Sequence, residues 1–153
     1  MENFREQLIQ VYKMTNQFGK LIGTELTKFE KDGIEYRLVI DDKHLATPTT
    51  AHGGVISGYM DGILGVAALY VSSEYGNLVS TVEFKINYLQ PVKKGDVLIG
   101  RGKVISKGKR IIISQGEIIN EETGEKVAIA TGTFNAYPHE KSGMTKNDFF
   151  NGD

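Results

Sequence analysis

Apolar residues follow different spacings along the chain, and each spacing predicts a different element. Between residues 52 and 73 they fall on all sides of a helical wheel, which predicts a long helix buried on most sides. Residues 2–14 carry apolar side chains at helical spacing on one face only, which predicts a short amphipathic helix. Over residues 81–88 apolar and polar residues alternate, as they do in a half-buried strand.

Turn signals divide the rest of the chain into strands. We expect strands at 21–30 and 33–41, joined by the turn Lys31-Asp32-Gly33. After the long helix we expect four strands in an antiparallel meander, with glycines marking a bulge in the second, at 81–88, 97–105, 110–120 and 126–137. A helix that is apolar all round is buried only if this sheet curls about it or a second copy covers it, so we predict an α+β fold.

Two features of the long helix need a physical reason. Gly58, Gly62 and Gly65 each cost about 1 kcal/mol against alanine, which indicates close approach to a helix, a sheet or a ligand. Asp61 is the only charged residue of the stretch, and a buried carboxylate is costly unless it is paired or functional. A core helix with one hydrogen-bonded carboxylate fits equally well. A membrane span fits the length, but Asp61, the glycines and the flanking strands oppose it.

Composition and charge exclude several classes of function. The 153 residues predict a single domain over 1–138, followed by a flexible tail at 139–153. A formal net charge of −1 gives no electrostatic basis for binding nucleic acid or an anionic membrane. The absence of cysteine excludes disulfides, thiolate zinc sites and a cysteine nucleophile. Residues 1–10 lack an apolar signal core, so we expect a cytoplasmic protein.

The long helix also carries a motif. His52-Gly53-Gly54 is followed by Asp61 nine residues after the histidine, and then by Gly65 and Ala67. This resembles the HGGxxxxxxDxxxGxA motif of the hotdog-fold acyl-CoA thioesterases, in particular the PaaI-like subfamily. The likeness spans residues 20–137, through VSTVEFKINYLQPVKKGDVLIGRGKVISKGKR and GEKVAIATGTF. It implies an antiparallel sheet wrapped around a central helix, homodimers often paired into homotetramers, and no metal or redox cofactor.

The loop before the motif departs from the family. Members of the family often carry an asparagine six residues before the motif histidine, where it helps to hold the catalytic groups or water. In this chain that position is Ala46, and Thr49 replaces the loop glycine. The departure leaves the fold assignment unchanged but makes a non-catalytic acyl-CoA-binding hotdog module the alternative to an acyl-CoA thioesterase.

Thioester hydrolysis requires fixed donors for the carbonyl oxygen and a group that delivers water or attacks the carbonyl carbon. The N–H groups of Gly53 and Gly54, at the helix start, suit the first task, and the resemblance puts the carbonyl on the Gly54 N–H. Asp61 suits the second task as general base or nucleophile. Because Gly54 and Asp61 lie seven residues apart, about 10 Å along one helix, a single carbonyl needs Asp61 from a two-fold related subunit.

Further candidates depend on the resemblance. Thr81 matches a family position whose hydroxyl orients the water, although an ordinary strand threonine fits equally. His52 is a catalytic candidate, but in the family it mainly shapes the loop. Neither His44 nor His139 shows metal-ligand spacing with it.

The remaining candidates concern substrate binding. The resemblance places the basic turn Lys107, Lys109 and Arg110 near the CoA phosphates, and a solvated hairpin is the alternative. Tyr59 and Met60 line either the acyl pocket or the core, and the sequence does not separate these two positions.

Overall fold

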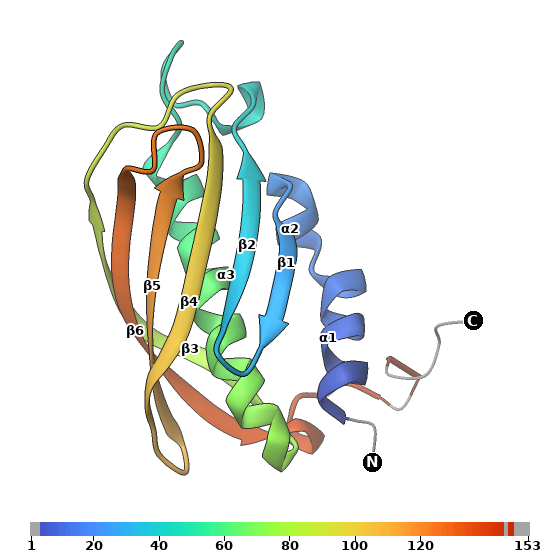
Figure 1. Ribbon diagram of the computed structural model, residues 1–153. Helices are drawn as coiled ribbons and strands as arrows, with labels where there is room; N and C mark the ends of the chain where they lie inside the picture. The colour runs from blue at the N-terminus through green and yellow to red at the C-terminus, as the bar shows by residue number, and fades with distance from the viewer. Residues whose placement is uncertain (1–3, 146, 149–153) are drawn as a thin grey trace.

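Six strands form one antiparallel sheet that curves around a single long helix, α3 (Figure 1). The computed structural model describes residues 4–145, 147 and 148. Its helices and strands are α1 (Phe4–Thr15), α2 (Gln17–Ile22), β1 (Glu25–Glu30), β2 (Gly33–Val39), α3 (Gly53–Ser72), β3 (Asn77–Tyr88), β4 (Val97–Lys107), β5 (Ile111–Asn120) and β6 (Lys126–Pro138). The strand order is β1-β2-β4-β5-β6-β3, and the α+β hotdog arrangement is confirmed. The expected four-strand meander is wrong, because only β4, β5 and β6 follow one another in the sheet, while β3 pairs with β6 at the edge.

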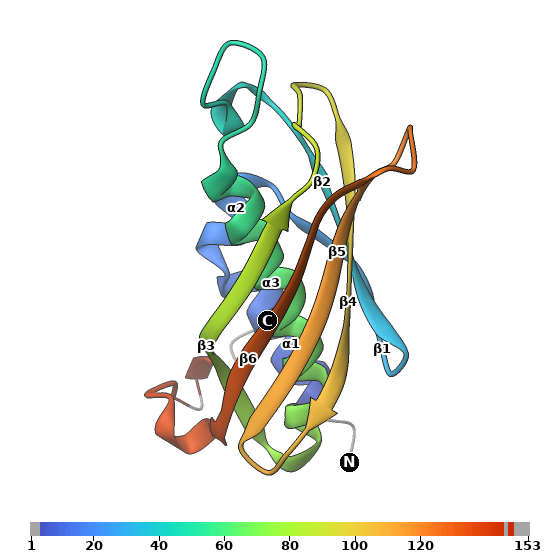
Figure 2. The same cartoon turned by 90° about the vertical axis from the view of Figure 1, so that its left-hand side faces the viewer.

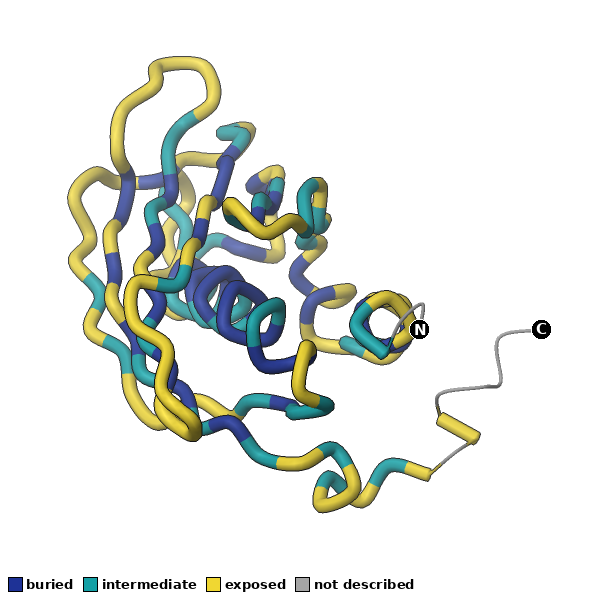
Figure 3. Tube along the Cα trace, turned by 60° about the horizontal axis from the view of Figure 1, so that its bottom comes forward, coloured by how far each residue is buried: buried dark blue, intermediate teal, exposed yellow. Residues whose placement is uncertain are grey.

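The sheet packs on one side of α3, while α1 and α2 lie on the side that it leaves open (Figures 1 and 2). In Figure 3 the trace of α3 is mainly dark blue and teal, because half of its residues are buried and most of the others are half-buried. Tyr59, Met60, Ile63 and Leu64 all point into this core, each at most 1% exposed. By length and composition Gly53–Tyr75 would be long and apolar enough to span a membrane, but here it is the core helix.

Sequence reasoning missed α2. The segment 21–30 was expected to be a strand, whereas Gln17–Ile22 is helical and β1 begins only at Glu25. Asn16 caps this helix, since its side chain accepts a hydrogen bond from the Gly19 N–H at 3.0 Å. Gly23 ends it with a φ of +86°, a conformation that favours glycine. Six residues are too few for a helical period to be visible in the sequence.

Other boundaries also differ from the expectation, including the ends of β2 at Val39 and of β4 at Lys107. Strand β3 begins at Asn77 rather than 81, because its first residues already pair with the end of β6. The expected tail at 139–153 is structured at its start, where His139–Lys141 form a short 3-10 helix and Met144 packs against Leu8, Leu69 and Leu78. The rest of that prediction, for residues 146 and 149–153, lies outside the described residues.

Glycines in β4 and β5 bring α3 close to the sheet. The bulge of β4 lies between Val104 and Ser106, so Gly100 and Gly102 do not mark it as expected. Both face the helix instead. A Cβ built on Gly102 would lie 2.8 Å from the Ile63 carbonyl oxygen, and one on Gly100 would lie 2.1 Å from Ile63 Cδ1. Side chains at these positions would force the helix away from the sheet.

We predict that Gly102→Ala lowers the free energy of unfolding by about 2 kcal/mol, as overpacked core substitutions do. The added methyl would meet helix backbone at Ile63, which cannot move independently. The matched control is Gly116→Ala in the paired strand, where the nearest atoms, Met60 Sδ at 3.0 Å and Leu64 Cδ2 at 3.1 Å, belong to side chains rather than to backbone. Urea unfolding of both variants measures the difference, and equal losses would contradict this account.

Candidate active site

The residue that precedes α3 caps the N-terminus of this helix. His52 is the N-cap residue, and its Nδ1 accepts a hydrogen bond from the Gly54 N–H at 2.7 Å. In this hydrogen bond Nδ1 carries no proton, so the ring N–H is at Nε2. The Gly53 carbonyl accepts a hydrogen bond from the Tyr88 hydroxyl at 3.1 Å, which ties the helix start to the end of β3. His52, Gly53 and Gly54 are all exposed, so a ligand has access to these peptide groups.

A buried histidine anchors the loop that leads to this cap. His44 is 2% exposed, and its Nδ1 accepts from the Asp41 N–H at 2.9 Å. Its Nε2 therefore donates to the Ile22 carbonyl at 2.6 Å, which joins the loop to the end of α2. The His44 carbonyl accepts the His52 N–H at 2.7 Å. His44 thus positions His52, a role that the sequence analysis did not assign to it.

Asp61 and Thr81 are brought together. The Thr81 hydroxyl donates to Asp61 Oδ1 at 2.8 Å, across the contact between α3 and β3. Strand β3 has a β-bulge between Thr81 and Glu83, and bulges re-aim side chains next to functional sites. Asp61 was expected to be buried, but it is partly exposed because it lies on the side of α3 that the sheet does not cover.

The three glycines of α3 have different neighbours. A Cβ on Gly58 would lie 2.8 Å from Cζ of Phe18, which comes from α2. A Cβ on Gly65 would lie 3.3 Å from Cε1 of Phe134 in β6. Around Gly62, next to Asp61, the described structure leaves open space within 4 Å. The close approach expected at these glycines is therefore to two aromatic side chains at Gly58 and Gly65.

Two cavities flank Asp61 on either side. The larger, of about 250 Å³, lies between α1, α3, β3 and β6 and is mostly apolar; it is lined by Leu8, Val11, Tyr12, Thr15, Asp61, Gly65, Val66, Leu69, Leu78, Val79, Thr81, Phe134, Tyr137 and Met144. The smaller, of about 150 Å³, lies between α2, α3 and β2 and includes Asn16 and Thr24 among its lining residues. Asp61 and Tyr12 line both cavities, so the carboxylate stands where an apolar space and a more polar space meet.

Tyr12 of α1 adds a hydroxyl to the surroundings of Asp61. Its oxygen accepts from Asn16 Nδ2 at 3.0 Å. Burial raises the pKa of Tyr12, a hydrogen bond with Tyr36 acts in the opposite direction, and the negative charge of Asp61 adds to the rise. The hydroxyl is therefore neutral near pH 7. Sequence reasoning placed Tyr12 only on the apolar face of a helix, and that pattern carries no signal for a site.

The basic turn lies far from Gly54 within one chain. Lys107 Nζ is 3.8 Å from Glu74 Oε2 and 4.4 Å from the centroid of the Tyr75 ring. Both partners follow the C-terminal end of α3, which is about 30 Å from its N-terminal end at 1.5 Å per residue. Lys107, and with it Lys109 and Arg110, therefore does not share a site with Gly54 inside a single chain.

Tyr59 and Met60 are core residues in this structure. The Tyr59 hydroxyl donates to the Tyr36 carbonyl at 2.9 Å and also contacts the Leu98 carbonyl at 3.3 Å. Met60 is fully buried, and its Sδ would lie 3.0 Å from a Cβ on Gly116 of the sheet. Neither side chain lines the larger cavity beside Asp61.

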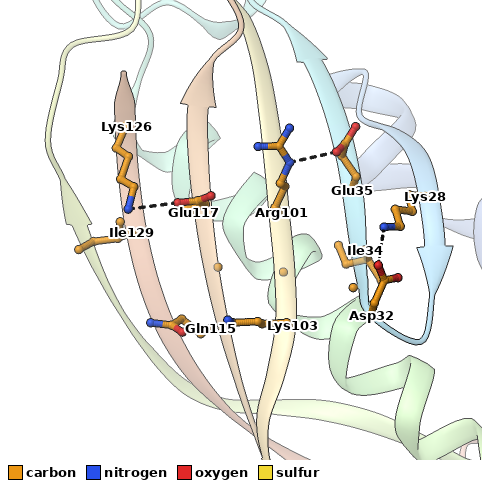
Figure 4. A pocket seen from close by; sticks show the side chains of 13 residues that line it. Lys28, Asp32, Ile34, Glu35, Arg101, Lys103, Gln115, Glu117, Lys126 and Ile129 are labelled. Carbon is orange, nitrogen blue, oxygen red and sulfur yellow. Dashed lines mark hydrogen bonds and ion pairs between the residues drawn. The ribbon is translucent and has the colours of Figure 1, made fainter. Parts of the chain in front are cut away.

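Another hollow, of about 530 Å³, lies on the outer face of the sheet, away from Asp61 (Figure 4). Four of its charged side chains pair across the strands, with Arg101 Nε 3.1 Å from Glu35 Oε2 and Lys126 Nζ 3.3 Å from Glu117 Oε2. Such pairing is typical of a solvated sheet face. Among the residues that the structure describes, no group of three histidine, aspartate or glutamate side chains could hold a metal ion.

Comparison with known proteins identifies the family to which the chain is similar. Residues 49–127 match the family model described as "Thioesterase superfamily". Human acyl-coenzyme A thioesterase 13 is 24% identical over 128 residues, covering 83% of this chain and 89% of the relative. The Escherichia coli PaaI protein from the phenylacetic acid degradation operon superposes with a TM-score of 0.77 at 19% identity, over 88% of this chain and 94% of that one.

A second solved structure is a Streptococcus mutans protein bound to acetyl CoA. It superposes with a TM-score of 0.66 at 29% identity, covering 75% of this chain and 89% of that one. The matched stretch 49–127 contains Gly54, Asp61 and Thr81, whereas α1 and all of β6 after residue 127 lie outside it.

Proposed function

This chain belongs to the thioesterase superfamily, and from that premise we propose that it hydrolyses acyl-CoA thioesters to a free acid and CoA. The observation that carries the proposal is the Asp61 carboxylate, hydrogen-bonded to Thr81 at the edge of an apolar cavity. The name of the human relative and the acetyl CoA bound to the Streptococcus mutans protein support acyl-CoA as the substrate class.

The active site is proposed to form between two subunits. Gly54 and Asp61 are seven residues apart on α3, about 10 Å, so one carbonyl cannot contact both within a chain. Strand β3, at one edge of the sheet, leaves Val82 58% and Tyr88 53% exposed. A long exposed edge strand is a ready surface for pairing with a second copy. Two-fold pairing there would set Asp61 of the partner subunit opposite Gly54.

In the proposed reaction the thioester oxygen accepts the Gly54 N–H, which requires the exposed His52 ring to rotate away from it. Asp61, oriented by Thr81, removes a proton from water while the water oxygen bonds to the carbonyl carbon. The tetrahedral oxyanion then collapses, the carbon–sulfur bond breaks, and the CoA sulfur takes the proton from Asp61. Direct attack by the carboxylate followed by hydrolysis of the anhydride gives the same products.

The test is release of free thiol from acyl-CoAs, followed with a chromogenic thiol reagent. We expect saturable hydrolysis with many turnovers per subunit, by a protein that elutes as a dimer or a larger assembly in gel filtration. A monomer with full activity would contradict the shared site. Tight binding of acyl-CoA without thiol release would instead favour the non-catalytic acyl-CoA-binding module.

A further inference from the structure

We propose that the apolar cavity beside Asp61 binds a linear, medium-chain acyl group, with an upper limit of about ten carbons set by its volume. This inference rests on the proposed thioesterase function and names its substrate class. The group would enter past Asp61 and Thr81, with the thioester at the mouth of the cavity and the hydrocarbon chain inside.

The cavity leads away from the catalytic pair along two elements. On α3, Asp61, Gly65 and Leu69 are four residues apart and therefore share one face of the helix. On β3, Thr81 and Val79 are two residues apart and share one face of the strand. Because β3 returns antiparallel to α3, both lines run from the Asp61–Thr81 hydrogen bond toward the same far end.

The residues that line the cavity favour a hydrocarbon ligand. Leu8 and Val11 of α1 face α3 across the cavity, and Met144 lies at its edge beside Leu69 and Leu78. Asp61 is the only charged residue in the described lining. An acyl chain loses contact with water in such a space and is bound by the hydrophobic effect. The smaller cavity, with Asn16 and Thr24 in its lining, is less suited to a hydrocarbon.

Size and shape favour a chain over a ring. The cavity has a volume of about 250 Å³, and the eight helical steps from Asp61 to Leu69 span about 12 Å. Its mean width is therefore about 5 Å, close to the roughly 4 Å contact diameter of one hydrocarbon chain. A cavity of about 150 Å³ holds one benzene molecule, so this one takes about ten carbons. A single aromatic ring would leave about two-fifths of it empty.

Several residues that line this cavity lie outside the stretch matched by the family model. That model matches residues 49–127, which include Asp61, Gly65, Val79 and Thr81. Helix α1, Phe134, Tyr137 and Met144 all lie outside the matched stretch. In this proposal, α1 and the residues of β6 and beyond that line the cavity determine which acyl length binds.

Binding is measured on the Asp61→Asn variant, so that hydrolysis does not interfere. Isothermal titration with acetyl-, butyryl-, octanoyl-, decanoyl-, dodecanoyl- and phenylacetyl-CoA gives the affinity of each. We expect affinity to rise by up to about fourfold per added methylene and to stop rising near ten carbons. Phenylacetyl-CoA should bind at least about tenfold more weakly than decanoyl-CoA. A flat series, or a preference for phenylacetyl-CoA, would overturn the assignment.

Substitutions in the walls locate the acyl chain. Val79→Phe fills the cavity and should lower the ratio of decanoyl- to acetyl-CoA affinity by about tenfold or more. Met144→Ala, at a partly exposed position, opens the cavity and should shift the optimum to dodecanoyl-CoA, so the proposal is tested even if Val79→Phe does not fold. Val39→Phe, on the 43% exposed Val39 of β2, is the matched control and should keep the wild-type profile.

The two proposals fail in different ways. If wild-type protein hydrolyses no acyl-CoA but Asp61→Asn shows the chain-length series, the thioesterase function is wrong and the acyl cavity stands. If wild-type protein hydrolyses acyl-CoAs while affinity ignores chain length and both wall substitutions, the function stands and the acyl cavity is wrong.

Discussion

Asp61→Asn is expected to lower kcat/KM for acyl-CoA hydrolysis by about 10³-fold, the middle of the range for loss of a general base. Asparagine has the same shape, and its Oδ1 can still accept the hydrogen bond that Thr81 donates to Asp61 at 2.8 Å. It can neither accept a proton from water nor attack the carbonyl carbon. The loss should therefore fall on kcat, with little change in the thermal unfolding temperature.

Thiol release under saturating and limiting acyl-CoA separates kcat from KM for this variant. The control is Asp32→Asn, which neutralises an exposed carboxylate 3.0 Å from Lys28 in the turn between β1 and β2. That change removes the same charge at a residue that lines neither cavity beside Asp61, so its hydrolysis rate should equal that of the wild type. Wild-type turnover by Asp61→Asn would remove Asp61 from the mechanism.

The central part of the fold could be predicted from sequence because its signals are local. Helix α3 has a strong apolar pattern, begins after a histidine cap, and was expected within one residue of its observed ends. Strands β5 and β6 were also expected within one residue, since tight turns with glycine separate them. In these segments local preference and tertiary packing agree.

The failures come from tertiary contacts that leave no periodic signal. Gly102 is a glycine because the backbone of Ile63 lies against it, a contact between positions 39 residues apart, so a bulge was the only local interpretation. Helix α2 is fixed by Asn16 and Gly23 at its two ends rather than by an apolar stripe. Neither feature could be deduced from neighbouring residues alone.

In the candidate site, too, local signals could be predicted from the sequence and tertiary contacts could not. The motif placed Asp61 and Thr81 on the right elements, but their hydrogen bond depends on the bulge in β3 and on how α3 packs. The apolar cavity depends on α1 docking against α3, which brings Leu8 to Leu69. Periodicity predicts that α1 has an apolar face but does not show which surface that face covers.

Mixed dimers of Asp61→Asn and Gly54→Pro subunits are expected to have about half of the wild-type activity, although each variant alone is nearly inactive. Gly54→Pro removes the N–H proposed to hold the carbonyl, and proline is tolerated in the first turn of a helix such as α3. If each site takes Gly54 from one subunit and Asp61 from the other, a mixed dimer contains one site with both native groups and one site with neither.

Co-expression with two different affinity tags and sequential purification isolates these mixed dimers for the thiol-release assay. Dimers of wild-type and Asp61→Asn subunits provide the calibration, because they hold one intact site whether the site is shared or lies within a chain. A site built within one chain would leave the double-variant dimers as inactive as their parents, since every chain then carries a defect. Activity near the calibration value therefore requires Asp61 to act on a carbonyl held by Gly54 of the partner subunit, as the seven-residue separation on α3 demands.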